Sequence, residues 1–391
     1  MCLPSLQNPP CFGPQGDVKA ASQRSFTVKL DILILGPVPP PLGGIGVHID
    51  RLVPLLQEAG LRVGVLNHFA STDRPFVLGA LKRNPINYYR LPGRISAHVV
   101  HYHHSHWLAF MALVLGKRGD ETQYIITLHG TALARRLNSR MPLVGRITRW
   151  GLRRFDAIIV VNEHIRDAIQ RHVETYELDV LPAFLPPLEE PPYQTSIERF
   201  LSLGTTLLVP VYRVQFLPDG RDLYGLDTAV EAFVALAPHR PELKLACFIA
   251  ERPRGRKAST HLSGLVGRLE RARLKDRARI VYGVSLVPAF RHDVIVVRAA
   301  RSEGDAVSVR EAISSKVPVI ASDVVDRPRG AITFTTGDSI DLCRAISIVL
   351  ERSKIGNEHL SVSDGESDGA QFLASLIRIY RSQLEAKPKG F

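Results

Sequence analysis

Two glutamates late in the chain, Glu303 and Glu311, stand eight positions apart in a segment whose pattern predicts a ligand site. The apolar runs Asp293 to Val297 and Pro318 to Ser322 have the length of strands, and Val307 to Ser314 between them can wind as a helix. One carboxylate then lies in the loop after a strand, and the other lies in the helix that follows. In a parallel sheet such loops gather at the carboxyl edge, where ligands bind.

The loop between these two carboxylates can hold an anion. Free backbone N–H groups and the positive end of the helix dipole attract negative charge, and Gly304 lets the backbone come close to it. The two glutamates can at the same time accept hydrogen bonds from hydroxyl groups of a sugar or a ribose. The segment therefore predicts a sugar-nucleotide site; the alternative is an acidic pair on an ordinary solvated helix.

This segment resembles the glutamate-seven-residues-glutamate motif of the family 4 glycosyltransferases, which are retaining enzymes of the GT-B fold. The resemblance implies that Glu303 positions the donor sugar at the reaction centre and that Glu311 contacts the ribose. It also implies that the amides between them bind the donor diphosphate, and these amides belong to Gly304, Asp305, Ala306 and Val307. Many members carry an aromatic residue after the glycine, where this chain has Asp305.

The chain has 391 residues, of which 45% are hydrophobic and 23% are charged, as expected for a globular protein of about two domains. Its net charge of +12 favours anionic partners such as a donor diphosphate, an acidic membrane surface or a lipid diphosphate. Nucleic acid is not expected, because basic residues are not interleaved with stacking aromatic residues. The cysteines lack metal or disulfide spacing, which favours a reducing cytoplasm; they are Cys2, Cys11, Cys247 and Cys343.

Strand-like runs alternate with helical patterns along most of the chain, which predicts parallel α/β sheets. The runs are Lys29 to Leu35, Leu61 to Leu66, Ala97 to Tyr102, Tyr124 to Leu128, Ala157 to Val161, Thr205 to Val211, Leu243 to Ile249 and Arg279 to Tyr282. A proline-rich interruption at Leu185 to Tyr193 predicts a domain boundary. We therefore expect two facing, doubly wound Rossmann-like domains with a ligand cleft between their carboxyl edges.

The expected division of the chain has four parts. Residues 1–27 are expected to form a disordered tail, without the charged start and apolar core of a secretory signal. Residues 28–188 form the first domain and residues 189–370 the second; the resemblance makes these the acceptor side and the nucleotide-sugar side. It also implies that residues 371–391 form a helix that returns to the first domain. The longest apolar stretch, Trp107 to Gly116, is too short to span a bilayer.

The first strand leads into a loop with Gly43, Gly44 and Gly46, where backbone can approach a phosphate or a sugar. Its spacing differs from that of a nicotinamide-binding loop, and Asn67 and His68 stand where such a site needs an acid. The resembled family has a similar first loop, which implies that Gly43 and Gly44 contact the donor. A tight turn without a ligand is the alternative.

The strand Tyr124 to Leu128 ends in His129, which could donate a hydrogen bond to a sugar hydroxyl or a phosphate. The family often has the same Leu-His-Gly pattern, which implies a role at the reaction centre; an ordinary loop histidine is the alternative.

A second group of histidines does not converge simply and has no acidic or cysteine partner close by: His98, His101, His103, His104 and His106. No metal and no cofactor are expected, because GT-B enzymes generally use the nucleotide sugar as a co-substrate.

The donor diphosphate needs a cation from the second domain, and Arg213 follows that domain's first strand. In many relatives such an arginine is joined by a lysine before the helix-opening glycine, where this chain has Tyr224. Arg221 or the helix terminus near Gly225 could compensate.

Between Ala132 and Phe155 a basic amphipathic region can rest on anionic lipid or pack on its own sheet; its arginines are Arg135, Arg136, Arg140, Arg146, Arg149, Arg153 and Arg154.

These features predict a retaining glycosyltransferase that moves a sugar from a nucleotide-sugar donor to a saccharide or lipid-linked acceptor in cell-surface polysaccharide biosynthesis. The enzyme is expected in the cytoplasm, with peripheral contact to the inner face of the membrane as an option. Two alternatives stay open. One is a sugar-nucleotide epimerase or hydrolase on the same fold. The other is a catalytically silent sugar-nucleotide-binding partner, suggested by the lysine that is absent at Tyr224.

Overall fold

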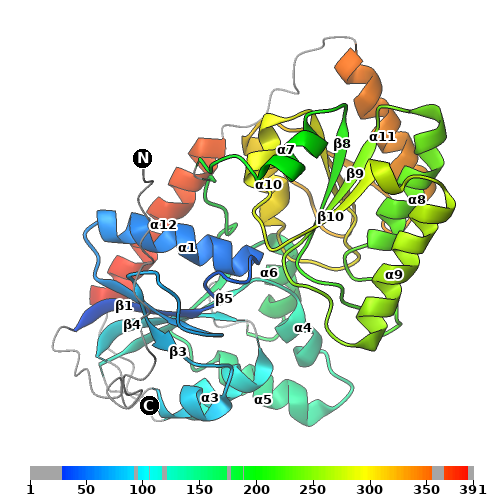
Figure 1. Cartoon of the computed structure of the whole chain (residues 1–391). Helices are drawn as coiled ribbons and strands as arrows, with labels where there is room; N and C mark the ends of the chain where they lie inside the picture. The colour runs from blue at the N-terminus through cyan, green and yellow to red at the C-terminus, as the bar shows by residue number, and fades with distance from the viewer. Residues whose placement is uncertain are drawn as a thin grey trace, which may run out of the picture.

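The computed structural model describes residues 29–91, 96–104, 106–116, 121–173, 178–187, 189–354 and 365–385. The tail expected over residues 1–27, together with Cys2 and Cys11, lies outside these ranges. Two sheets with helices on both faces form two domains, one built from the first half of the chain and the other from the second half (Figure 1).

Seven parallel strands form the sheet of the first domain, in the order β3-β2-β1-β4-β5-β6-β7. Their bounds are Leu30–Gly36 (β1), Val63–Asn67 (β2), Val77–Ala80 (β3), Ala97–His104 (β4), Gln123–Leu128 (β5), Ala157–Val160 (β6) and Leu178–Val180 (β7). The helices are Gly44–Glu58 (α1), Pro85–Arg90 (α2), Trp107–Leu115 (α3), Ala132–Leu137 (α4), Pro142–Leu152 (α5) and Glu163–Gln170 (α6). The central strands are buried on both faces, which explains their continuous apolar sequence.

Six parallel strands form the second sheet, in the order β10-β9-β8-β11-β12-β13. Their bounds are Thr206–Val211 (β8), Lys244–Ile249 (β9), Ala278–Tyr282 (β10), Val294–Arg298 (β11), Val319–Ser322 (β12) and Ala331–Phe334 (β13). The α-helices are Thr195–Leu201 (α7), Leu226–Leu236 (α8), Arg256–Arg271 (α9), Val307–Ser314 (α10), Ser339–Lys354 (α11) and Gly365–Glu385 (α12). Short 3-10 helices occupy Ala237–His239, Lys275–Arg277 and Val287–Arg291.

The prediction of two doubly wound parallel sheets is confirmed, and the strand orders show where ligands should bind. The order reverses between β1 and β4 in the first sheet and between β8 and β11 in the second. Loops that leave the carboxyl ends of strands at such a reversal diverge to opposite faces and open a crevice. The loops after β1 and β11 contain Gly43 and Glu303, so the predicted residues lie at the two crevices.

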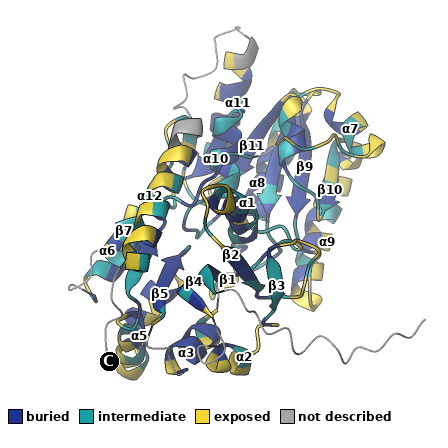
Figure 2. Ribbon diagram, turned by 90° about the vertical axis from the view of Figure 1, so that its left-hand side faces the viewer, coloured by how far each residue is buried: buried dark blue, intermediate teal, exposed yellow. Residues whose placement is uncertain are grey.

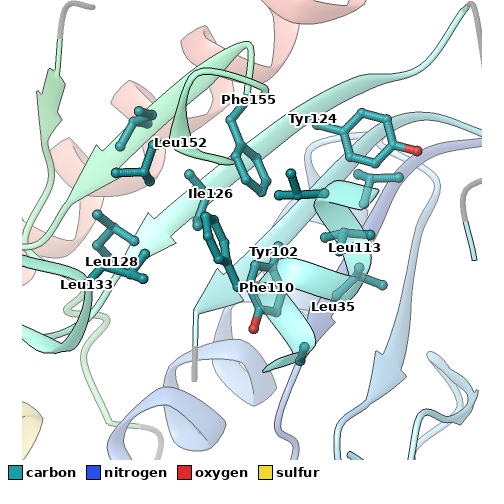
Figure 3. Close-up of a cluster of buried hydrophobic side chains, with 14 of the residues drawn as sticks. Leu35, Tyr102, Phe110, Leu113, Tyr124, Ile126, Leu128, Leu133, Leu152 and Phe155 are labelled. Carbon is teal, nitrogen blue, oxygen red and sulfur yellow. The ribbon is translucent and has the colours of Figure 1, made fainter. Parts of the chain in front are cut away.

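Helices α3 and α5 pack on one face of the first sheet through a core rich in aromatic residues (Figure 3). The rings of Phe110 and Phe155 stack with their centroids 6.0 Å apart. A Cβ atom built on Gly151 of α5 would lie 2.7 Å from the ring of Phe110, so this glycine allows the close approach of the two helices. Buried side chains therefore line the strands, and exposed ones lie on the outer helix surfaces (Figure 2).

The terminal helix α12 packs against the first domain, beside α1 and β1 (Figure 1). Phe372, Leu376 and Tyr380 join the core formed by the residues of β1, α1 and β4. The Tyr380 hydroxyl lies 2.6 Å from Nδ1 of His101.

The chain passes from the first sheet to the second between Val180 and Thr206, and the proline-rich segment falls within that connection. No helix among the described residues has the length and apolar character needed to cross a membrane.

Three histidines are buried between the first sheet and α12. The rings of His101 and His103 lie on the same face of β4 with centroids 4.3 Å apart, and His48 of α1 packs 5.7 Å from His103. Burial lowers the pKa of His48 and of His101 to about 3 and holds the pKa of His103 well below its usual value. All three are therefore neutral at physiological pH.

We expect the free energy of unfolding to fall as the pH decreases from about 7.5 to about 5, because the unfolded histidines bind protons near pH 6.5 and the buried ones do not. Each buried histidine contributes a slope of up to about 1.4 kcal/mol per pH unit in that range. Urea unfolding at a series of pH values measures the slope. His48→Gln should reduce it, and the exposed His239→Gln should leave it unchanged. Equal slopes in both variants would contradict this account.

Candidate active site

A cavity of about 740 Å³ lies between the two domains and is lined by loops and helix starts from both. From the first domain come the loop after β1 with the start of α1, and the loop after β5. From the second come the loops after β8 and β11 with the start of α10. Nine of the ten predicted site residues line it: Gly43, Gly44, His129, Glu303, Gly304, Asp305, Ala306, Val307 and Glu311.

Glu303 lies in the loop after β11 and is held by two arginines. Nε of Arg298 donates to one carboxylate oxygen at 2.8 Å, and Nη1 of Arg327 donates to the other at 2.7 Å. Burial by itself would raise the pKa of Glu303, but the two positive charges outweigh it and lower that pKa. The carboxylate is therefore ionised and fixed in the cavity wall, where its remaining lone pairs can accept hydrogen bonds from a sugar.

Glu311 of α10 forms an ion pair with Arg51 of α1, which belongs to the other domain. Nη2 of Arg51 lies 2.6 Å from Oε1 of Glu311, and Nη1 donates to the carbonyl oxygen of Leu185 at 3.1 Å. Both side chains are nearly buried. A carboxylate has two oxygens, so Glu311 can bind a ribose hydroxyl through the second one while the first holds the domains together.

Gly304 sits where the two domains touch. Its carbonyl oxygen accepts a hydrogen bond from Nδ2 of Asn162 at 2.7 Å, and a Cβ atom built on it would lie 2.2 Å from the carbonyl oxygen of His129. The next residue, Asp305, pairs with Arg310 at 2.7 Å, and burial raises the pKa of its carboxyl group. Its side chain is therefore engaged by α10.

Two helices begin at the cavity without a side chain that can cap them. Gly43 is the N-cap residue of α1, and Ala306 is the N-cap residue of α10. Neither residue has a side-chain oxygen, so the first N–H groups of both helices can be satisfied by an anion. The two helix starts are in contact, because a Cβ atom on Gly44 would lie 3.5 Å from Val307. Such an arrangement can bind a diphosphate.

His129 connects the cavity wall to the buried histidines. Its Nε2 lies 2.9 Å from Nδ1 of His103, and the two rings stack with centroids 5.1 Å apart. His101, the next of these histidines, lies between Tyr380 and Thr127, with Nε2 2.7 Å from the threonine hydroxyl. The orientation of His129 is thus fixed by the interior of the first domain. Across the described ranges, no group of three or more His, Cys, Asp or Glu side chains is arranged to hold a metal.

Arg213 does not share the cavity with the other nine predicted residues. Among the described residues it is absent from the cavity lining, and its Nε donates to Oε1 of Gln215 at 3.3 Å. Its guanidinium lies 5.6 Å from the ring centroid of Tyr212. The role of Arg213 as the diphosphate cation therefore stays a prediction.

Four residues that the sequence reasoning missed hold the predicted ones in place: Arg51, Arg298, Arg327 and Asn162. Arg298 carried a signal, because it is a charged residue at the carboxyl end of an apolar strand. Arg51 carried none, since its partner lies in the other domain. Asn162 also carried a signal, because asparagine is a typical N-cap residue. It caps α6 by accepting a hydrogen bond from the N–H group of Ile165 at 2.8 Å.

Comparisons with known proteins bear on the family and the fold of the chain. The profile of Glycosyltransferase Family 4 matches residues 42–184, which cover most of the first domain. Sucrose-phosphate synthase from Thermosynechococcus elongatus has the same fold, with a TM-score of 0.66 and 14% identity over 90% of this chain and 98% of that one. A glycosyltransferase from Rickettsia africae gives a TM-score of 0.61 and 12% identity, over 92% of this chain and 100% of the other.

HepE from Anabaena, solved in complex with UDP and glucose, gives a TM-score of 0.60 and 13% identity over 91% of this chain and 100% of that one. No curated protein sequence matches the chain. The resemblance to the family 4 glycosyltransferases and to the GT-B fold is confirmed by the family profile and by these folds. The predicted enzyme class, a glycosyltransferase, is the class of the matched family.

We expect Gly304→Ala to force the domains apart, because the new methyl group would overlap the carbonyl oxygen of His129. The free energy of unfolding should fall by about 1–3 kcal/mol, the usual cost of overpacking. The radius of gyration measured by small-angle X-ray scattering should rise. Gly264→Ala in α9 is the matched control, because a Cβ atom there meets open space and alanine favours a helix. Identical behaviour of the two variants would refute the close contact.

Proposed function

We propose that this chain transfers a sugar from a nucleotide-sugar donor to a saccharide or lipid-linked acceptor, with retention of the anomeric configuration. One observation carries the proposal: two carboxylates of the second domain and two uncapped helix starts, one from each domain, converge on one cavity of about 740 Å³. Its size is that of a typical small-molecule site. Carboxylates suit the hydroxyl groups of sugar and ribose, and helix starts suit the diphosphate.

The solved neighbours support a sugar nucleotide as the donor. HepE is described in complex with UDP and glucose, and the trehalose-6-phosphate protein of Escherichia coli is described bound with UDP-2-fluoro glucose. Each has the fold of this chain at low identity, 13% and 12% respectively. The nucleotide base of the donor used by this chain is therefore left to experiment.

In the proposed reaction the residues of the cavity position groups and carry charge. The N–H groups at the start of α10 stabilise the negative charge that develops on the leaving diphosphate. Contact between the domains excludes water and aligns the acceptor hydroxyl with the anomeric carbon. Glu303 positions the donor sugar, and His129, fixed by His103, donates a hydrogen bond to it. We assign no covalent nucleophile. The acceptor oxygen attacks the anomeric carbon from the face of the leaving diphosphate, the bond from that carbon to the diphosphate breaks, and a diphosphate oxygen takes the proton of the acceptor hydroxyl.

A panel of UDP-, GDP- and ADP-sugars in a thermal-shift assay tests the donor site. One member should raise the melting temperature, because a ligand that binds only the folded state stabilises it. Glu311→Gln should weaken that ligand by about 10- to 100-fold, the value of a hydrogen bond to a charged group. Each shift is measured from the melting temperature of the same variant without ligand. Glu58→Gln, exposed at the end of α1, is the control.

The same panel separates the alternatives. Release of free nucleotide from the bound donor without any acceptor would favour a hydrolase. Binding without turnover in the presence of membrane extracts would favour a silent binding protein. Failure of every nucleotide sugar to shift the melting temperature would contradict the proposed function.

We further propose that the first domain rests on the inner face of the membrane and there receives a lipid-linked acceptor for a cell-surface polysaccharide. Helices α2, α3 and α5 adjoin one another (Figure 2). Of the ten large hydrophobic side chains that are exposed in the described structure, seven lie on or beside these helices: Ile86, Tyr89, Leu108, Leu115, Met141, Leu143 and Trp150. An apolar face of this kind suits a lipid interface.

The charge of this region supports an anionic membrane. Residues 74–155 contain fourteen Lys or Arg and two Asp or Glu, a net charge of +12 that equals the charge of the whole chain. The rest of the chain carries equal numbers of basic and acidic residues, so the net positive charge arises in the part of the chain that carries the apolar face. Arg135 of α4 lines the interdomain cavity, and α4 contacts α5, one of the helices of the apolar face.

Cosedimentation with lipid vesicles tests the membrane proposal. The protein should bind vesicles that contain phosphatidylglycerol and not vesicles of phosphatidylcholine alone, and salt should weaken the binding. Leu143→Ser should reduce the affinity by about tenfold, the value of one buried leucine. Leu203→Ser in the second domain is the matched control, because both leucines are 66% exposed. Equal losses of vesicle affinity in the two variants, or equal binding to charged and neutral vesicles, would contradict the membrane proposal.

A further inference from the structure

A nucleotide diphosphate in the cavity needs positive charge from the second domain, and the arginines predicted to supply it are absent from the described residues that line the cavity. Arg213 is not among the described residues that line the cavity. Tyr224 occupies the position where many family members have a lysine. Arg221, a possible substitute, is exposed and pairs with Asp219 at 2.6 Å. The helix starts contribute only partial charges, so a full cation has to come from another element.

Arg298, the last residue of β11, occupies the place of that cation. Among the described residues that line the cavity from the second domain, it is the one Lys or Arg. Its guanidinium lies 5.0 Å from the ring centroid of Tyr224. The positive charge therefore stands next to the position of the absent lysine, although it comes from a different strand.

The guanidinium of Arg298 is fixed before any ligand arrives. Nε donates to Glu303 at 2.8 Å, and Nη1 donates to the carbonyl oxygen of Pro210 at 2.8 Å. Burial works against its charge, but Glu303 and Tyr224 outweigh this effect and raise the pKa of Arg298. A cation held in this way loses little side-chain entropy on binding, and a low-dielectric wall strengthens its attraction for an anion.

The charges around Glu303 do not balance. Two guanidinium groups, Arg298 and Arg327, contact one carboxylate, so the three side chains carry a net charge of +1. Arg327 directs its other donors to the backbone oxygen and hydroxyl of Ser322, which are neutral. All three side chains are nearly buried, with exposures of 12%, 3% and 7% for Arg298, Arg327 and Glu303. A buried excess of charge is unfavourable without a counter-ion, which indicates an anionic ligand at this wall.

We infer that Arg298 binds the diphosphate of the donor, in place of the lysine that is absent at Tyr224. This inference rests on the proposed function, because that function supplies the diphosphate. Glu303 then has two tasks: it contacts the donor sugar, and it orients Arg298. The substitution at Tyr224 consequently leaves the cavity with a full cation, which argues against a silent binding protein.

Calorimetric titration of nucleosides and their diphosphates tests the inference. Uridine, guanosine and adenosine are each compared with UDP, GDP and ADP, using wild-type protein and the variants Arg298→Gln and Arg213→Gln. Wild-type protein should bind a diphosphate more tightly than its nucleoside, and we call the ratio of the two affinities the preference. This preference should fall by about 10- to 100-fold in Arg298→Gln, as expected for the loss of a charge-assisted hydrogen bond. Arg213→Gln tests the arginine that the sequence predicts for the same role, and it should lose less of this preference than Arg298→Gln. The double variant Arg298→Gln with Tyr224→Lys should recover part of the loss, because it restores a cation at the neighbouring position.

The possible outcomes are distinct. If Arg298→Gln weakens a nucleoside and its diphosphate equally, or if Arg213→Gln alone loses the preference, Arg298 only supports the fold and the inference is wrong. If wild-type protein binds no nucleotide of the panel, the proposed function is wrong, and so is the inference that rests on it. Arg298→Lys guards against a folding defect, because it keeps the charge and should retain part of the preference. Loss of the preference in Arg298→Lys, with an unchanged melting temperature, would also count against the role.

Discussion

The contact between the two domains at the loop after β11 is the constraint on which the cavity depends. Gly304 meets the backbone of His129 so closely that no side chain fits between them, and Asn162 holds its carbonyl oxygen. The ion pair of Arg51 and Glu311 spans the same gap. Because these contacts come from loops at strand ends and from helices packed on the sheets, the rigid sheets fix the distance between the walls of the cavity. A site that binds two parts of one ligand requires this fixed spacing.

The acidic side chains of the cavity are neutralised by arginines, whereas positive charge remains elsewhere in the cavity. Each predicted acid in the cavity is paired with an arginine: Glu303 with Arg298, Asp305 with Arg310, and Glu311 with Arg51. The acids therefore remain ordered and are oriented by their partners. Positive potential remains at the helix starts and beside Glu303, where a diphosphate would lie. In the proposed function, the residues that hold the domains together also contact the charged and hydroxyl groups of the donor.

Much of the fold could be predicted because the central strands are buried on both faces and read as apolar runs. The strands β3, β7 and β13 were missed, since they are short and only partly buried at the ends of their sheets. The glycine loops and the glutamate pair could be found because each follows a strand at a sheet reversal. Arg298 and Arg51 could not be assigned, because their partners are decided by packing across elements.

The two doubly wound sheets and the loops that face the cleft could be predicted from the sequence alone, and the sequence also predicts a sugar nucleotide as the ligand. Apolar periodicity and turn chemistry are local properties, so one chain is enough to read them. The folded chain shows what the sequence could not: Glu311 pairs with Arg51, and Arg298 stands beside Tyr224. It also shows Arg213 in contact with Gln215. These contacts depend on the relative placement of two sheets, which is set by packing between residues far apart in the chain.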